Sequence, residues 1–278
     1  MISVISAIKG RPDITKKCFE KIWKLADDPY DIEHIIAVDC NDQPILHYIE
    51  HDYKRFVAQF AATNKIQIYK VCHCKKPELY PLRKMSRDYW NPIAKKCEGN
   101  IIFGLTNDCE ILTNGYDTIL NDAYVKYSKI YNHSYFQFII DDDGVSDNPP
   151  RESTFCSWLI CTKPVVDLIG GIMPSELSSE SGDTYMYGVF NQTTIKSQID
   201  LFDKIKTKHI DHYSGHTKRD FVSKFKPIPD AIRKDYDKCR QKMYDDNYYG
   251  LILDNAILKE ALKSKNLIIK DEKHTSKI

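Results

Sequence analysis

The fold is restricted most by a recurring pattern, in which a short apolar run ends abruptly in acids or amides and a helix-like segment follows. Such runs occupy residues 2–8, 32–38 and 101–105, and the last two are followed by Asp39 and by Asn107-Asp108. Short apolar runs of this kind are typical of strands buried in a parallel sheet. Strand, polar tip and helix therefore alternate as in βαβ units, which predicts an α/β fold with a mostly parallel sheet flanked by helices.

The same reading gives the order of the elements along the chain. Strands are predicted near residues 2–8, 32–38, 66–71, 101–105, 135–140 and 155–161. Helices are predicted from Pro12, over 45–60, from the pair Asn91-Pro92, over 116–127 and over 164–169. Beyond about residue 200 the strand pattern stops and helical spacing takes over. We therefore expect one α/β domain over 1–216 and a helical extension over 217–278 packed on it, with a frayed tail.

Composition excludes several classes of protein. The 278 residues carry a formal net charge of +1, so no strong field favours nucleic acid or an anionic membrane. The cysteines number nine and form no CxxC pair, which argues against a disulfide framework and a zinc ribbon. The start of the chain does not resemble a signal peptide, and no apolar run is long enough to span a bilayer. These features predict a soluble cytoplasmic protein with reduced thiols.

The polar strand tips are the predicted site. Because ligands of parallel sheets gather outside the carboxyl ends of the strands, Asp39 and Asn107-Asp108 are expected near one ligand. A carboxylate there can bind a divalent metal, which in turn can hold a diphosphate. Taken alone, each of these acids is explained more simply as a residue that forms a turn at the end of a strand. The run Asp141-Asp142-Asp143 is either a second metal cluster or, as we favour, a solvated loop.

Several of these segments resemble a known family, the GT-A nucleotide-sugar glycosyltransferases, particularly the inverting family 2. The resemblance extends over about residues 2–216 and rests on 3–5 with 9–12, 35–39, 91–110 with 115–117, 170–171, 182–184 and the histidine-rich stretch 209–216. It implies a Rossmann-like sheet and transfer of a sugar from a nucleotide sugar. No part of the C-terminal helices takes part in the resemblance.

The resemblance implies roles for polar residues at the carboxyl ends of the first two strands and at one helix end. Asp39 would accept a hydrogen bond from the nucleotide base, most plausibly from N3–H of uracil. Lys9 and Arg11 would lie near the nucleotide, and Asp42 near the base or ribose. The helix end at Asn91 would approach the donor.

The stretch Thr106-Asn107-Asp108 matches a reduced form of the family's DxD motif. Asp108 takes the place of the last acid, which holds Mn²⁺ or Mg²⁺ on the diphosphate, and Asn107 is an auxiliary. Thr106 is a departure, so one carboxylate stands where two are usual. A late histidine completes the metal site in several such enzymes, which suggests His212 or, alternatively, His216. Imidazole suits Mn²⁺ better than Mg²⁺.

Asp183 matches the position of the catalytic base, which takes the proton of the acceptor hydroxyl and gives a product of inverted configuration. The same Asp is also placed to cap a helix, and Glu180 is the second choice for the base. Glu110 is expected to face solvent or the acceptor. The aromatic residues Trp158, Tyr185 and Tyr187 are either acceptor-stacking residues or part of the core.

The sequence thus predicts an inverting glycosyltransferase, a hexosyl- or pentosyltransferase, with a UDP-sugar donor and a glycan or glycoprotein acceptor. A protein that binds nucleotide sugars or carbohydrates without catalysis is the main alternative, because the DxD motif is reduced. A nucleotidyltransferase is a weaker one, since its Gly-rich first loop is here only Lys9-Gly10-Arg11-Pro12.

Overall fold

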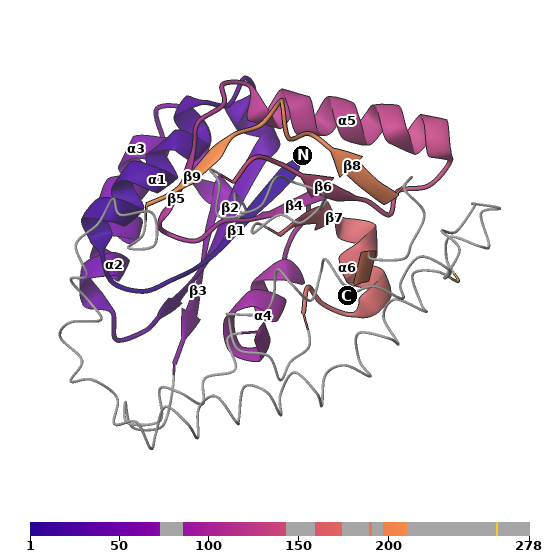
Figure 1. Cartoon of the computed structure of the whole chain (residues 1–278). Coiled ribbons are helices and arrows are strands. Elements are labelled where there is room, and N and C mark those ends of the chain that lie inside the picture. Colours follow the sequence, from indigo (N-terminus) through magenta and orange to yellow (C-terminus); the bar gives the residue numbers. More distant parts are fainter. Residues whose placement is uncertain (73–85, 143–158, 174–188, 191–196, 211–259, 261–278) are drawn as a thin grey trace, which may run out of the picture.

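The computed structural model describes residues 1–72, 86–142, 159–173, 189–190, 197–210 and 260. Its centre is a seven-stranded sheet with the strand order β3-β2-β1-β4-β7-β6-β8 (Figure 1). The strands are β1 (Ile2–Ile8), β2 (Ile32–Asp39), β3 (Ile66–Val71), β4 (Ile101–Gly104), β6 (Gln137–Ile139), β7 (Ile160–Thr162) and β8 (Gln198–Asp200). The predicted α/β fold with a mostly parallel sheet is confirmed.

The four strands β3, β2, β1 and β4 run parallel. All side chains of β1 and β2 are buried, as expected for strands covered on both faces. β7 pairs antiparallel with β4 and with β6, whereas β6 and β8 are parallel to each other. The carboxyl ends of β1, β2 and β4 therefore meet at one edge of the sheet.

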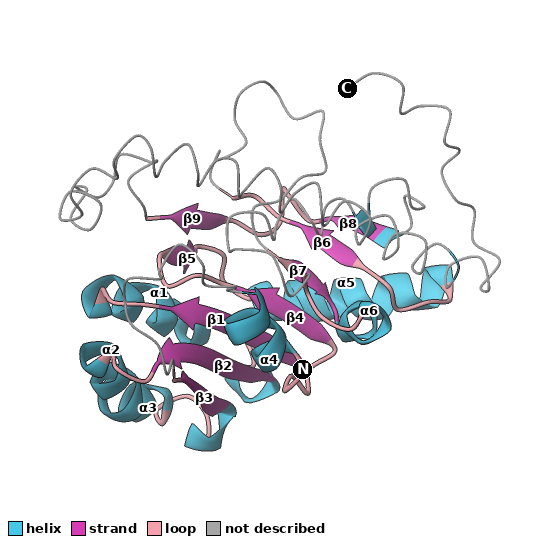
Figure 2. Ribbon diagram, turned by 90° about the horizontal axis from the view of Figure 1, so that it is seen from below, coloured by secondary structure: helices cyan, strands magenta, loops and turns pink. Residues whose placement is uncertain are grey.

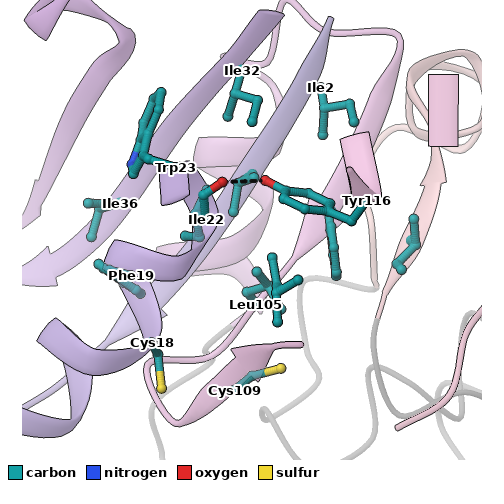
Figure 3. Close-up of a cluster of buried hydrophobic side chains, with 14 of the residues drawn as sticks. Ile2, Cys18, Phe19, Ile22, Trp23, Ile32, Ile36, Leu105, Cys109 and Tyr116 are labelled. Carbon is teal, nitrogen blue, oxygen red and sulfur yellow. Dashed lines mark hydrogen bonds between the residues drawn. The ribbon is translucent and has the colours of Figure 1, made fainter. Parts of the chain in front are cut away.

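One face of the sheet is covered by α1 (Pro12–Lys24), by a helical segment from Gln43 to Val57 and by α5 (Tyr116–Tyr131). The helical segment consists of α2 (Gln43–His47), a π-helical middle, η2 (Tyr48–Tyr53), and α3 (Lys54–Val57). Figure 3 shows the core between α1, α5 and the strands, with the Tyr116 hydroxyl donating to the Ile22 carbonyl at 2.9 Å.

The opposite face carries α4 (Asn91–Ala94) and α6 (Lys163–Ile169), which lie on the other side of the sheet from α1 and α5 (Figures 1 and 2). The predicted helix start at Asn91-Pro92 is only partly right. The chain is already helical over η5 (Ser86–Trp90), a π-helical turn that leads into α4. α6 ends at Gly170, whose φ of 81° is the left-handed conformation that favours glycine after a helix.

A second, two-stranded sheet joins β5 (Cys109–Ile111) to β9 (Thr207–His209) in antiparallel register. Both strands are short and neither was predicted. The expectation that strands stop beyond about residue 200 is wrong, because β9 pairs with the segment that follows Asp108. Apart from residue 260, the predicted helical extension lies outside the described residues.

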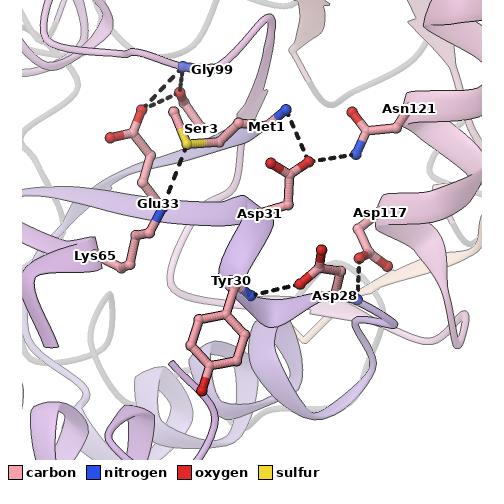
Figure 4. A network of polar contacts seen from close by, with 10 residues as sticks. All are labelled: Met1, Ser3, Asp28, Tyr30, Asp31, Glu33, Lys65, Gly99, Asp117 and Asn121. Atoms are coloured by element: carbon pink, nitrogen blue, oxygen red, sulfur yellow. Dashed lines mark hydrogen bonds and ion pairs between the residues drawn. The ribbon is translucent and has the colours of Figure 1, made fainter. Parts of the chain in front are cut away.

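At the opposite end of β1, the Glu33 carboxylate accepts hydrogen bonds from the Ser3 hydroxyl and from the backbone N–H of Gly99 (Figure 4). It also accepts the backbone N–H of Glu98. Glu33 is 3% exposed, so these donors compensate a buried charge. These hydrogen bonds join the segment just before β4 to β1 and β2.

The triplet Gly115-Tyr116-Asp117, part of the family resemblance, joins α5 to the end of α1. Asp117 is buried and accepts from the backbone N–H groups of Asp27 and Asp28 at 2.9 and 2.8 Å. The Gly115 N–H donates to the Leu25 carbonyl at 2.6 Å. These contacts give the triplet a role in packing the two helices together.

The acidic run at 141–143 is not a simple solvated loop. Asp142 is fully buried, and Asp141 forms a parallel bridge with Lys206. Asp143 lies outside the described residues.

Within the parts of the chain that the structure describes, no helix is long and apolar enough to cross a membrane.

Candidate functional site

The site predicted from the strand tips lies at the carboxyl edge of β1, β2 and β4. The register pairs Ile8 with Val38, and Ile5 with Gly104, so the loops after these strands leave the sheet side by side. Lys9, Arg11, Asp39, Asp42, Asn107 and Asp108 all lie in these loops or at their strand ends.

Asp39 is the last residue of β2 and is only 2% exposed. The Tyr89 hydroxyl, from η5 on the face of the sheet that also carries α4 and α6, donates a hydrogen bond to its Oδ1. Lys9 Nζ lies 3.8 Å from its Oδ2. The carboxylate is therefore held between a neutral donor and a cation, which compensate its burial.

Asp42 fixes the loop that follows β1. Its Oδ2 accepts the Gly10 backbone N–H at 2.6 Å. Gly10 and Arg11 both have positive φ, 58° and 53°. Glycine adopts this conformation freely, but for Arg11 it is strained, so the surrounding contacts must hold the loop in place.

Asn107 provides one such contact from the β4 side. Its Nδ2 donates to the Gly10 carbonyl at 3.3 Å and to the Thr15 hydroxyl at 3.1 Å. Thr15 in turn binds the Arg11 carbonyl through its hydroxyl at 2.9 Å and its N–H at 3.0 Å. The three loops are thus joined by direct hydrogen bonds.

Asp108 forms an ion pair with Arg11, with Nη2 2.7 Å from Oδ2. The Asp108 side chain is 11% exposed and the Arg11 side chain 36% exposed. The arginine therefore reaches from the loop after β1 to the turn after β4 and keeps one end in solvent. It brings a fixed positive charge to the site, because guanidinium does not lose its proton in proteins.

The residues around Asp108 fit a hard divalent cation. The Asp108 carboxylate already attracts a cationic group, and hard cations prefer oxygen ligands. Among the described residues, the Thr106 Oγ1 is a buried atom without a hydrogen-bond partner, so it is a second oxygen at this turn. No group of three or more His, Cys, Asp or Glu side chains gathers in the described part of the chain. Further ligands would come from the diphosphate, from water or from residues outside the described ranges.

β9 brings the late part of the chain to this point. The Ile210 N–H donates to the Asp108 carbonyl at 2.7 Å, and β9 pairs with Cys109–Ile111. The sequence around His212 and His216 follows within a few residues. Both histidines lie outside the described residues, as do Asp183, Glu180, Trp158, Tyr185 and Tyr187.

Asn91 lies in the core on the other face of the sheet and is 8% exposed. Its Nδ2 donates to the Met173 carbonyl at 2.8 Å, and its Oδ1 accepts the Ile172 N–H at 3.0 Å. A side chain at Gly171 would meet this amide oxygen at 2.8 Å. Asn91 thus holds the turn after α6, and binding of the donor by Asn91 stays a prediction.

Of the two expectations for Glu110, the one that it faces solvent is wrong, because Glu110 is 4% exposed, and contact with the acceptor stays a prediction. Its Oε1 is 2.8 Å from Lys21 Nζ and 3.5 Å from Lys17 Nζ, both on α1. Alternation along β5 turns its side chain toward α1. Burial, with smaller contributions from Asp108 and Glu110, raises the pKa of the neighbouring Cys18 thiol to about 12, which disfavours the thiolate form.

Tyr89 and Thr15 are site residues that sequence reasoning missed. Tyr89 belongs to a helical turn on the opposite face, and nothing in its local sequence indicates contact with Asp39. Thr15 lies in the predicted amphipathic helix that begins at Pro12. Its hydroxyl binds the Arg11 carbonyl beside a left-handed turn that the sequence does not indicate.

Comparison with known proteins supports the fold. No family model and no curated protein matches the sequence. Among solved structures, the chain resembles S. aureus TarS 1–349 in complex with UDP, with a TM-score of 0.51 and 16% identity. That match covers 74% of this chain and 59% of the TarS chain.

A second structure is the mannosyltransferase PcManGT from Pyrobaculum calidifontis in complex with GDP-Man and Mn²⁺. Its TM-score is 0.52 at 11% identity, and the match covers 95% of this chain and 75% of the other. The chain therefore has the GT-A fold of nucleotide-sugar glycosyltransferases.

Proposed function

We propose that this protein is an inverting glycosyltransferase that moves a sugar from a UDP-sugar to a hydroxyl group of a glycan or glycoprotein. The observation that carries the proposal is the joining of three polar strand tips at one edge of a GT-A sheet. Gly10 with Asp42, Gly10 with Asn107 and Arg11 with Asp108 are in direct contact across the ends of β1, β2 and β4.

The surroundings of Asp39 favour a uracil base. The binding edge of uracil carries one N–H donor between two carbonyl acceptors. One Asp39 oxygen accepts from Tyr89 and the other faces Lys9, which combines a carboxylate acceptor with a nearby cationic donor. Guanine presents two adjacent donors, which are best matched by a carboxylate with both oxygens turned to the base. We therefore expect UDP to bind more tightly than GDP.

Arg11 would contact the diphosphate, because a guanidinium is well suited to bind phosphate oxygens at two points. Asp108 and His212 would hold Mn²⁺ or Mg²⁺. The bound metal supplies positive charge that offsets the charge on the departing diphosphate. The hydrogen bond from Ile210 to the Asp108 carbonyl supports this assignment, since it starts the segment leading to His212 beside Asp108.

Asp183 would act as the base. It would take the proton of the acceptor hydroxyl while that oxygen attacks the anomeric carbon from the side opposite the diphosphate. The new bond to the acceptor forms as the bond to the diphosphate oxygen breaks, and the electron pair leaves with UDP. Attack from the opposite side inverts the anomeric configuration. Positive charge from Arg11 favours departure of the diphosphate.

A protein that binds nucleotide sugars without catalysis is the second candidate. It is favoured by one observation, that the single carboxylate of the reduced motif is already paired with Arg11. Turnover separates the two functions, because only an enzyme releases UDP from a UDP-sugar. A nucleotidyltransferase would release pyrophosphate instead.

A thermal-stability screen tests the proposed ligand. UDP, GDP and a set of UDP-sugars are added to the full chain with and without Mn²⁺, since a ligand of the native state raises its melting temperature. We expect UDP and at least one UDP-sugar to stabilise the protein more than GDP does. Equal stabilisation by UDP, GDP and AMP would contradict selective binding of uracil, and no stabilisation by any of them would contradict the nucleotide site.

A further inference from the structure

The ion pair between Arg11 and Asp108 joins two residues with opposing requirements in the proposed reaction. Asp108 would bind a metal cation, and Arg11 would bind the diphosphate anion. In the structure without ligands, these two side chains neutralise each other at 2.7 Å. A guanidinium and a divalent cation at the same carboxylate repel each other, so the pair opposes binding of a metal on its own.

The backbone of Arg11 is fixed, whereas the end of its side chain is accessible. The backbone carbonyl of Arg11 is bound twice by Thr15, and the preceding Gly10 is bound by Asp42 and Asn107. By contrast, 36% of the side chain is exposed. The guanidinium can therefore exchange partners by rotation of its side chain without moving the loop.

Three lysines near the edge are paired with other carboxylates. Lys9 is paired with Asp39, and Lys17 and Lys21 are paired with Glu110. Because arginine keeps its charge at any physiological pH, its effect on Asp108 is relieved by a competing anion rather than by loss of a proton. The diphosphate of a nucleotide sugar, bound at this edge, is an anion of higher charge than one carboxylate.

We propose that Arg11 is an exchangeable counter-ion that transfers from Asp108 to the diphosphate, and so couples binding of the metal to binding of the nucleotide. This inference rests on the proposed function. In the free protein, Arg11 occupies Asp108 and the metal binds weakly. When the diphosphate attracts the guanidinium, Asp108 is released to the metal. Linkage is reciprocal, so the metal must strengthen nucleotide binding by the same factor.

The test measures Mn²⁺ affinity directly, from the paramagnetic resonance signal of the free ion, for the full chain with and without saturating UDP. The wild type is compared with Arg11→Gln, which removes the guanidinium and keeps a polar side chain. Lys16→Gln is the matched control, because it removes one positive charge from an exposed position of α1, the helix that follows Arg11.

In the wild type, UDP is expected to tighten Mn²⁺ binding at least about fivefold, the lower end of typical coupling between sites. In Arg11→Gln, Mn²⁺ alone should bind more tightly than to the wild type, and the effect of UDP should shrink by a similar factor. Lys16→Gln should behave as the wild type. If Arg11→Gln does not fold, as judged by thermal unfolding, Arg11→Lys should show the same direction of change with a smaller size.

Two results would overturn the coupling. One is equal Mn²⁺ affinity with and without UDP in the wild type, including no Mn²⁺ binding in either case. The other is an Arg11 variant, with bound UDP, that retains the full wild-type coupling. In both results UDP still binds, and the proposed transfer can still occur. A protein that neither binds UDP nor releases it from a UDP-sugar would instead contradict the proposed function itself.

Discussion

The hydroxyl of Tyr89 donates a hydrogen bond to Oδ1 of Asp39, although the two residues are 50 positions apart in the sequence. Tyr89 is 2% exposed and lies in the helical turn η5, whereas Asp39 ends β2. The tyrosine thereby fixes the rotation of the carboxylate proposed to read the base. It is a positioning residue.

Removing this hydroxyl should weaken nucleotide binding. We expect Tyr89→Phe to lower UDP affinity about tenfold, which corresponds to the loss of one hydrogen bond to a charged group. Isothermal titration with UDP measures the change, and Tyr30→Phe, at an exposed tyrosine, is the control. Since Lys9 remains beside Asp39, some affinity should persist. Wild-type affinity in Tyr89→Phe would show that the hydroxyl does not orient the carboxylate.

Gly99 should be required for packing at the opposite edge of the sheet. A Cβ atom there would lie 2.6 Å from the Ser3 Oγ and 2.8 Å from the Met1 carbonyl oxygen. Since backbone atoms must move to relieve this overlap, Gly99→Ala should lower the free energy of unfolding by about 1–3 kcal/mol. Urea unfolding measures the loss. In Gly104→Ala, where the nearest atom is at 3.3 Å, the loss should be smaller.

His34 should make stability depend on pH. Burial lowers the pKa of His34 from 6.5 to about 3, and its ring nitrogens bind the hydroxyls of Ser6 and Tyr53. Below pH 6.5 the unfolded chain binds a proton that the native state does not. The free energy of unfolding should therefore fall with decreasing pH, by roughly 1.5 kcal/mol between pH 6.5 and 5 from this group.

The contribution of His34 is isolated by comparing variants at both pH values. His34→Gln should be less stable than the wild type at pH 7 but should lose less stability on acidification. The exposed His47→Gln should retain the wild-type slope. Identical slopes for His34→Gln and the wild type would mean that the pKa of His34 is not lowered in the native state.

Asn91 has a structural role that can be separated from donor binding. Loss of its hydrogen bonds to Ile172 and Met173 in Asn91→Ala should lower the free energy of unfolding by about 1–3 kcal/mol. Asn121→Ala, which removes a hydrogen bond to Asp31 at a partly exposed site, should cost less. UDP affinity measured in parallel tests the family-based prediction: an affinity unchanged in Asn91→Ala would contradict contact of this residue with the donor.

The main elements of the fold could be predicted because their signals are local. The apolar runs of β1, β2 and β3 and the spacing in α1 and α5 appear directly in the sequence. β5 and β9 could not be predicted, because each is three residues long and is stabilised by a partner almost 100 positions away. The burial of Glu110 could not be predicted for the same reason, since its lysine partners on α1 become neighbours only through the fold.

The candidate site was only partly visible in the sequence. Asp39 and Asp108 were recognisable as strand tips, and the parallel topology predicted that they share an edge. Their partners Tyr89 and Arg11 are set by the packing of η5 and by a left-handed turn, neither of which has a local pattern. The strained backbone conformation of Arg11 in particular is held in place by Asp42, Thr15 and Asn107 together.

The most direct test of the proposed function is UDP release from a set of UDP-sugars by the wild type and by Asp183→Asn, with UDP affinity measured for both. We predict that the wild type releases UDP, and that Asp183→Asn releases it at least about a hundredfold more slowly, as expected for loss of a general base. Its UDP affinity should stay close to that of the wild type. Equal rates of UDP release from the two proteins would contradict the assignment of the base, and no release from any UDP-sugar by the wild type would contradict the proposed transfer.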